Sequence, residues 1–378
     1  MSEANKFFIK KANNFLKIIN NLLVISENLC YFMHFFKEGQ TKFIIMRKNL
    51  LFLFIVFLLS GVVNAQQDAQ FTQNMFNQMA INPGYAGSHD AICATALFRQ
   101  QWMGFTETVN GNENKVAPQT MLFSLHSNVD AIRGGLGLVV YKDKLGYEDN
   151  IGVKFGYAYR MPLQGGTLGI GLMAGFLNKK IDFSQFNYVD AGDPLLSSQN
   201  VESDMVFDLA FGAYYNKPGV FYAGLSSNQL MQSQTDMVAQ AANLGSPQLK
   251  RHYYLTGGYQ YQLPNNPQFE LRPSIFVKSD FASTQLDVNA LMYYNNQFWG
   301  GLSYRMQDAI AILLGAQPFI NSGNKSLETL GVGYSYDITT SAMGRSGRSS
   351  GSHEILLNYC FKIVIVIPPD SYRNVRFL

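Results

Sequence analysis

The chain has 378 residues, of which 47% are hydrophobic, 14% aromatic and 15% charged, with a formal net charge of +3. This composition excludes a disordered protein, a coiled coil and a disulfide scaffold, because the chain is too apolar, too rich in glycine and has only three cysteines. The charged fraction lies below the roughly 25% typical of soluble domains. Together with abundant Phe and Tyr, it favours strands that face lipid.

Residues 46–65 have the pattern of a secretory signal peptide. Met46 is followed by Arg47 and Lys48, an apolar run covers residues 50–59, and small residues precede a cleavage position after Ala65. Because a signal peptide begins at its initiating methionine, we interpret residues 1–45 as an over-extended start. The alternative is a real extension with a membrane helix over residues 15–36, which charged side chains interrupt.

The net positive charge of the chain comes from residues 1–65. Residues 1–65 hold eight basic and three acidic residues, so the remainder has 21 basic and 23 acidic residues and a net charge of −2. Nucleic-acid binding would need clustered Lys and Arg. We therefore expect no nucleic-acid partner.

From residue 91 onwards, apolar residues alternate with small or polar ones, which is the period of a β-strand. In a soluble sandwich the second face would be charged, whereas here it is mostly Gly, Ser and Gln. A membrane barrel explains this pattern, with the apolar face towards lipid and the small polar face towards the lumen. The predicted strands are fourteen: 91–103, 117–128, 134–143, 149–161, 166–178, 203–216, 218–227, 251–262, 268–280, 284–295, 297–306, 309–317, 328–337 and 353–366.

The predicted fold class is therefore all-β, a closed antiparallel transmembrane β-barrel of about 14 strands over residues 91–366. A periplasmic lead (residues 66–90) precedes it and a tail (residues 367–378) follows. Short turns at 161–165 and 216–219 are expected in the periplasm, and the long polar connections 182–202 and 226–250 outside the cell. Aromatic residues near strand ends are expected to form the interface girdles: Trp102, Tyr141, Tyr147, Tyr159, Tyr214, Tyr215, Tyr253, Tyr261, Tyr293, Tyr294, Trp299 and Tyr304.

No motif predicts an enzyme, a cofactor or a metal site. Residues 347–351 match a nucleophile-elbow pattern but lie in a Ser/Gly-rich loop between two strands, without the helix that the motif requires. The glycines at 169, 171 and 175 only approximate a dinucleotide fingerprint and read as strand glycines of a thin lumen wall. The four histidines after residue 65 lack metal-ligand spacing, and His353 and Glu354 should point to opposite faces of a strand.

Two cysteines remain after removal of the leader, Cys93 and Cys360. They lie at the start of the first strand and near the end of the last, which are neighbours in a closed barrel, and by alternation both face the lumen. Two readings stay open, a disulfide between them or two separate thiols in small-residue positions.

The two ends of the predicted barrel resemble the PorP/SprF family of type IX secretion system outer-membrane proteins of the Bacteroidota. The resemblance rests on FNQMAINPGYAGS (residues 76–88) followed by FRQQW (98–102), and on GSHEI (351–355), Leu357-Asn358-Tyr359 and the closing residues 372–378. It covers the whole chain after the leader. The upstream residues 1–45 depart from it.

This resemblance implies an outer-membrane component of the type IX secretion and gliding machinery. Its partners would be outer-membrane lipid, subunits of the machinery, and secreted cargo with a C-terminal sorting domain that is exported or attached to the surface. The alternative is a passive outer-membrane channel for small solutes.

The residues that carry the resemblance are candidates for partner docking, although turn chemistry in the lead fits a plug of the barrel floor equally well. Alternation places Arg99 on the lumen face, where an interior salt bridge explains it better than cargo contact. The candidates are Asn82, Pro83, Gly84, Tyr85, Gly87, Arg99, Gln100 and Trp102.

Overall fold

The computed structural model describes residues 68–109, 112–185, 201–235, 248–320, 327–342 and 347–361. They all belong to one compact unit, Val62–Leu378. The expected upstream extension (1–45), signal peptide (46–65) and tail (367–378) lie outside the described residues.

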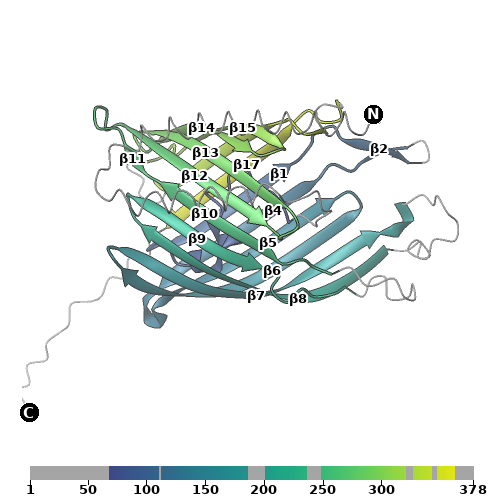
Figure 1. Cartoon of the computed structure of the whole chain (residues 1–378), viewed down its shortest axis with the longest axis horizontal. Coiled ribbons are helices and arrows are strands. Elements are labelled where there is room, and N and C mark those ends of the chain that lie inside the picture. Colours follow the sequence, from purple (N-terminus) through teal and green to yellow (C-terminus); the bar gives the residue numbers. More distant parts are fainter. Residues whose placement is uncertain are drawn as a thin grey trace, which may run out of the picture. The chain divides into compact units, whose positions relative to one another are not determined.

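Within the described residues, fourteen strands form a closed up-and-down antiparallel barrel (Figure 1). Consecutive strands pair around the sheet, and the first strand pairs with the last. The barrel strands are β1 (Ile92–Gln100), β4 (Gln119–Val129), β5 (Gly134–Leu145), β6 (Glu148–Leu163), β7 (Gly166–Asp182), β8 (Val201–Lys217), β9 (Phe221–Asn228), β10 (His252–Tyr259), β12 (Phe269–Ser279), β13 (Thr284–Tyr294), β14 (Phe298–Arg305), β15 (Ala309–Ala316), β16 (Gly331–Thr339) and β17 (Ser352–Phe361).

The predicted closed barrel is confirmed, and each of the fourteen predicted segments overlaps one observed strand. The prediction missed the polar hairpin of β2 (Thr106–Val109) and β3 (Asn112–Lys115), which follows β1. It merged the short β11 (Tyr261–Gln262) with β10. Four short helices complete the described elements: α3 (Gln78–Ile81), η1 (Pro83–Tyr85), η2 (Asp130–Ile132) and η3 (Phe183–Gln185).

Alternation along the strands separates two faces of the barrel wall. In β7, Ile170, Leu172 and Phe176 are exposed on the outside, while Gly171 and Met173 between them are buried inside. The exposed outer face of the barrel is lined by large apolar side chains of this kind on every side, which is the surface a bilayer requires. Among the described residues, the helices are too short or too polar to cross a membrane.

The two ends of the barrel differ in their connections. One end carries the β2–β3 hairpin and the connections β7–β8 and β9–β10, and we call it the long-loop end. The other end, the short-loop end, holds the start of β1, the end of β17 and tight turns such as Gln164-Gly165 between β6 and β7. Both turn residues have positive φ angles of 48° and 78°, the pattern of a two-residue type I′ hairpin.

The expected periplasmic lead lies instead inside the barrel. Its described part, residues 68–90, which we call the lead, hydrogen-bonds to inward-facing residues of β10 and β12 at Asp68 and packs against β7 and β8 through η1. The physical reason is that the inner face offers buried charges and bare glycine backbone, both of which the lead satisfies. Alternation alone does not reveal what fills a barrel.

Candidate functional site

The candidate site is the barrel interior and the lead that occupies it. The lead begins at the long-loop end, where the Tyr254 hydroxyl donates to Asp68 Oδ2 at 2.7 Å and Lys278 Nζ donates to the Asp68 carbonyl at 3.0 Å. It ends at the short-loop end, where Ala86 and Gly87 lie against the start of β5. The lead therefore crosses the interior from end to end.

Electrostatics favour the ionised form of Asp68 at the start of the lead. Burial raises the pKa of its carboxyl group. Nearby positive charges, His252 first among them, and the hydrogen bond from Tyr254 outweigh burial, so the pKa lies below its ordinary value.

A cluster of buried charges holds the next part of the lead. Arg99 donates to Asp337 at 2.8 Å and to Glu354 at 3.0 Å, and Arg305 donates to Asp337 at 3.3 Å. The Thr72 hydroxyl lies between them, because it accepts from Arg99 at 2.7 Å and from Arg305 at 3.1 Å and donates to Asp337. We call Thr72, Arg99, Arg305, Asp337 and Glu354 the charge cluster.

The lead also joins the charge cluster through its backbone. The amides of Thr72 and Gln73 donate to the two oxygens of the Glu354 carboxylate, each at 2.8 Å. Because amide donors stabilise a buried carboxylate, the lead supplies part of what makes this charge tolerable inside the barrel. The wall and the lead therefore depend on each other at this point.

Glycines of the wall make room for the second half of the lead. A Cβ atom on Gly169 or Gly171 of β7 would overlap the backbone of Gly84 or Pro83. One on Gly135 of β5 would overlap the backbone of Ala86. The glycines at 137, 212 and 333 likewise face Met79, Asn82 and Gln73. The inner wall is thus shaped to the path of the lead.

Asn82 fixes the turn at which the lead changes direction. Its Oδ1 accepts from the Gly84 amide at 2.9 Å, which caps the one-turn helix η1 with Pro83 in its first position. Its Nδ2 donates to the carbonyl of Ala213 in β8 at 2.9 Å. One side chain therefore shapes the lead and ties it to the wall.

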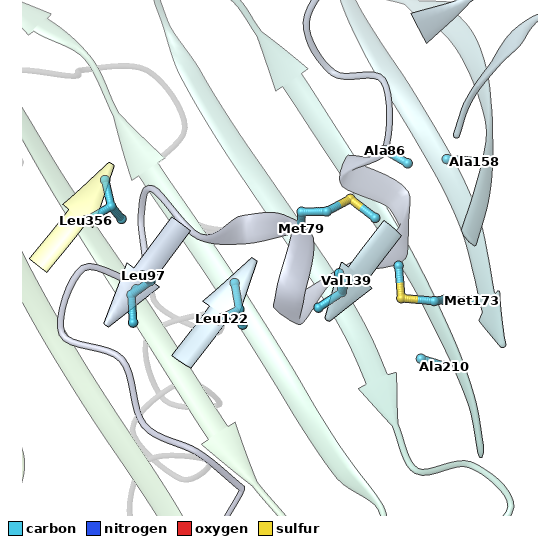
Figure 2. Close-up of a cluster of buried hydrophobic side chains, with 9 residues drawn as sticks. All are labelled: Met79, Ala86, Leu97, Leu122, Val139, Ala158, Met173, Ala210 and Leu356. Carbon is cyan, nitrogen blue, oxygen red and sulfur yellow. The ribbon is translucent and has the colours of Figure 1, made fainter. Parts of the chain in front are cut away.

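Apolar contacts complete the packing around α3 and η1. Figure 2 shows Met79 and Ala86 of the lead among wall residues of several strands, with Leu97, Leu122 and Leu356 on one side and Met173 and Ala210 on the other. Phe76 packs on Trp299 with ring centroids 5.4 Å apart, and Tyr85 packs edge-on against Tyr214 at 5.0 Å.

Four of the residues expected in the aromatic girdles therefore belong to the interior. Tyr214, Tyr293 and Trp299 are buried on the inner face, and Tyr141 packs against the apolar cluster around Met79. Their position near strand ends suggested the interface, but their alternation places them inside. Outward-facing members such as Tyr159, Tyr294 and Tyr304 are exposed as expected.

The structure joins Cys93 and Cys360 in a disulfide across the seam between β1 and β17, where they are direct register partners. The interior salt bridge expected of Arg99 is present. His353 and Glu354 point to opposite faces, as predicted, because Glu354 is buried inside while His353 contacts the Tyr334 hydroxyl at 2.7 Å.

A polar cavity of about 470 Å³ opens beside the start of the lead. Its lining includes Asp68, Lys278, Asp143 and Asp308, together with Trp102. The cavity lies at the long-loop end, where the lead begins its path through the barrel interior.

Comparison with known proteins identifies the family. The model of the type IX secretion system membrane protein family PorP/SprF matches residues 63–359. The chain belongs to the PorP/SprF family. No curated protein matches it in sequence.

Solved outer-membrane barrels resemble this PorP/SprF protein in fold. The toluene transporter TbuX of Ralstonia pickettii gives a TM-score of 0.42 at 10% identity, covering 76% of this chain and 93% of that one. TodX of Pseudomonas putida, also a toluene transporter, gives 0.41 at 11% identity, with 80% and 96% covered. At these TM-scores the similarity says nothing about function, and the strand pairing alone defines the barrel.

The residues that carry the PorP/SprF resemblance fall into two groups in space. Asn82, Pro83, Gly84, Tyr85 and Gly87 belong to the lead near the short-loop end, where wall residues surround them. Within the described part of the chain, the contacts of these residues are with the barrel wall and with the lead itself.

The second group lies at the long-loop end of the PorP/SprF barrel. Arg99 belongs to the charge cluster, and Gln100 Nε2 donates to the Pro118 carbonyl at 3.2 Å. The Trp102 amide donates to Ser352 Oγ at 3.0 Å, and Trp102 lines the cavity. Residues 347–351 lead directly into β17 rather than into a helix, so the nucleophile-elbow pattern lacks its fold context.

Sequence reasoning missed the partners of Arg99. It did not predict that Thr72, Arg305 and Asp337 meet at Arg99, although Arg305 and Asp337 alternate onto the inner face of their strands. Charged residues of opposite sign at inward positions of β1, β14, β16 and β17 were the available signal, because a barrel interior must pair them.

Proposed function

We propose that this protein serves type IX secretion as an outer-membrane barrel occupied by its own lead. In this role it helps to export or attach to the surface proteins with C-terminal sorting domains, by binding partners rather than by conducting solutes. The family supports the association with type IX secretion. The observation that carries the non-conducting role is the lead, which crosses the interior and is hydrogen-bonded through Thr72 and Gln73 to the buried charge cluster.

The proposal also specifies that the signal peptide is removed and which end of the barrel faces the periplasm. The signal peptide over residues 46–65 is cleaved during export, and the short-loop end faces the periplasm. The long-loop end, with its cavity and hairpin, then faces the outside, where a surface-attached cargo would be held. Machinery subunits and cargo are the partners.

Deletion of the gene, followed by mass spectrometry of surface and secreted proteins, tests the secretion role. We expect proteins with sorting domains to disappear from the surface and to return when the wild-type gene is restored. An unchanged set of surface proteins would overturn the proposal.

Planar-bilayer recording of the purified barrel tests the alternative of a passive channel. We expect the wild type to show no steady conductance, and a variant whose residues 68–81 are replaced by a Gly/Ser linker to conduct. A stable ohmic current in the wild type, joined with loss of solute uptake in the deletion strain, would favour the channel.

A further inference from the structure

Three side chains with metal-binding atoms meet at the short-loop end. His89 ends the lead, Cys93 begins β1, and His126 lies on β4 directly opposite Cys93 in the register. One ligand atom from each of the three lies within 4.8 Å of the others. Their spacing in the sequence shows no metal motif, because the fold brings them together from three elements.

A second observation points to a ligand at this place. The Nδ1 atom of His126 has no hydrogen-bond partner among the described residues, although the residue is only 4% exposed. A buried polar nitrogen without a partner destabilises the folded state. A metal ion would use this nitrogen.

We propose that His89, Cys93 and His126 form a zinc site when Cys93 is a free thiol. Two imidazoles and a thiolate are ligands that Zn²⁺ prefers, and water would fill the fourth tetrahedral position. Zinc bonds of about 2.3 Å to sulfur and 2.0–2.1 Å to nitrogen require the ligand atoms to approach one another further. Rotation about the side-chain torsions of His89, Cys93 and His126 would have to supply this approach.

The disulfide and the zinc site exclude each other. In the structure Cys93 is bonded to Cys360, and a disulfide sulfur is not a thiolate ligand. Reduction by a dithiol donor adds two electrons and two protons to the bond, which gives two thiols and leaves the donor as a disulfide. Binding of Zn²⁺ then releases the Cys93 proton to solvent.

The two states hold the barrel differently. The disulfide links β1 to β17 across the seam. The zinc ion would instead link β1 and β4 to His89 at the end of the lead. Reduction and zinc binding would thus replace a link between two wall strands with a link between the wall and the lead.

The Cys360→Ser variant tests the proposal because it frees Cys93 without any reductant. The purified variant in detergent is titrated with Co²⁺, a spectroscopic substitute for Zn²⁺, and absorption is recorded. We expect one Co²⁺ per chain, with a thiolate-to-cobalt band in the near ultraviolet, and competition by Zn²⁺. The oxidised wild type should show no such band, and should gain it after treatment with a phosphine reductant.

Matched variants separate the site from adventitious binding. The double variant Cys93→Ser/Cys360→Ser lacks the thiolate, and Cys360→Ser/His126→Asn lacks the buried imidazole. Each should weaken binding by more than the roughly 10- to 100-fold that changes outside the ligand set cost. Folding of each variant is checked by heat-modified migration on gels. Equal cobalt binding by Cys360→Ser and the double variant, or no band in reduced wild type, would overturn the proposal.

Discussion

Replacing Arg99 with alanine should release the lead from the charge cluster. Arg99 bonds to Thr72, Glu354 and Asp337 at 2.7, 3.0 and 2.8 Å, and removing one partner of a buried ion pair costs about 3–5 kcal/mol. The lower value applies here, because Asp337 keeps its contact with Arg305 and Glu354 keeps two backbone donors. A cost of about 3 kcal/mol corresponds to a change of roughly 100- to 200-fold in an equilibrium constant.

Hydrogen exchange measures this change directly. The amides of Thr72 and Gln73 donate to Glu354, so their exchange reports the opening of the lead. In detergent, Arg99→Ala should accelerate their exchange by about 100-fold, while amides in the middle of the barrel strands stay protected. The control is Lys142→Ala, which removes a side chain that is 47% exposed and paired with Asp149, and which should change exchange of the lead little.

A second variant tests the cause. Adding Asp337→Asn to Arg99→Ala removes one of the two carboxylates that have lost Arg99, leaves both acceptors of the Thr72 and Gln73 amides in place, and should restore part of the protection. If Arg99→Ala folds and its lead exchanges within threefold of the wild type, the charge cluster does not hold the lead and the reasoning fails.

Three further predictions concern the wall. Gly171→Ala places a Cβ atom against the lead and should lower the free energy of unfolding by about 1–3 kcal/mol. Gly257→Ala, whose Cβ atom would have its nearest contacts at 3.8 Å, should change this free energy by under about 0.5 kcal/mol. Equal effects of the two variants in urea unfolding would contradict the fit between lead and wall. Leu172→Arg, at a side chain 53% exposed on the outer face, should cost about 2–4 kcal/mol in lipid, and a cost near zero would argue against lipid contact. The wild type should migrate differently on reducing and non-reducing gels, and Cys93→Ser should abolish the difference; a shift that survives in the variant would exclude this disulfide.

Alternation along the sequence was sufficient to predict the barrel, because lipid requires every strand to have an apolar outward face. β7 was predicted over 166–178 and extends to Asp182. Three of the four additional residues are polar, Lys179, Lys180 and Asp182, and they continue the strand through pairing with β6 and β8 rather than through an apolar face. The β2–β3 hairpin was missed for the same reason, since it has no apolar face.

The contacts inside the barrel could not be predicted from local sequence patterns. Trp299 was expected in a girdle because it lies near a strand end. It shares the inner face of β14 with Gly301, Ser303 and Arg305. Which segment fills the space inside depends on contacts such as that of Thr72 with Asp337, 265 residues apart in the chain. Single-sequence periodicity contains no information on such pairs.

The position of the lead also constrains how the barrel assembles. The lead is joined to β1 at the short-loop end and reaches the long-loop end with its other terminus, so a barrel that had already closed would have to be threaded by it. Entry of the lead before the seam between β1 and β17 closes avoids this threading. The carboxylates that bind Thr72 come from β16 and β17, the last strands to be synthesised. The charge cluster can form only once the last hairpin has arrived, and its ion pairs mark a completed barrel.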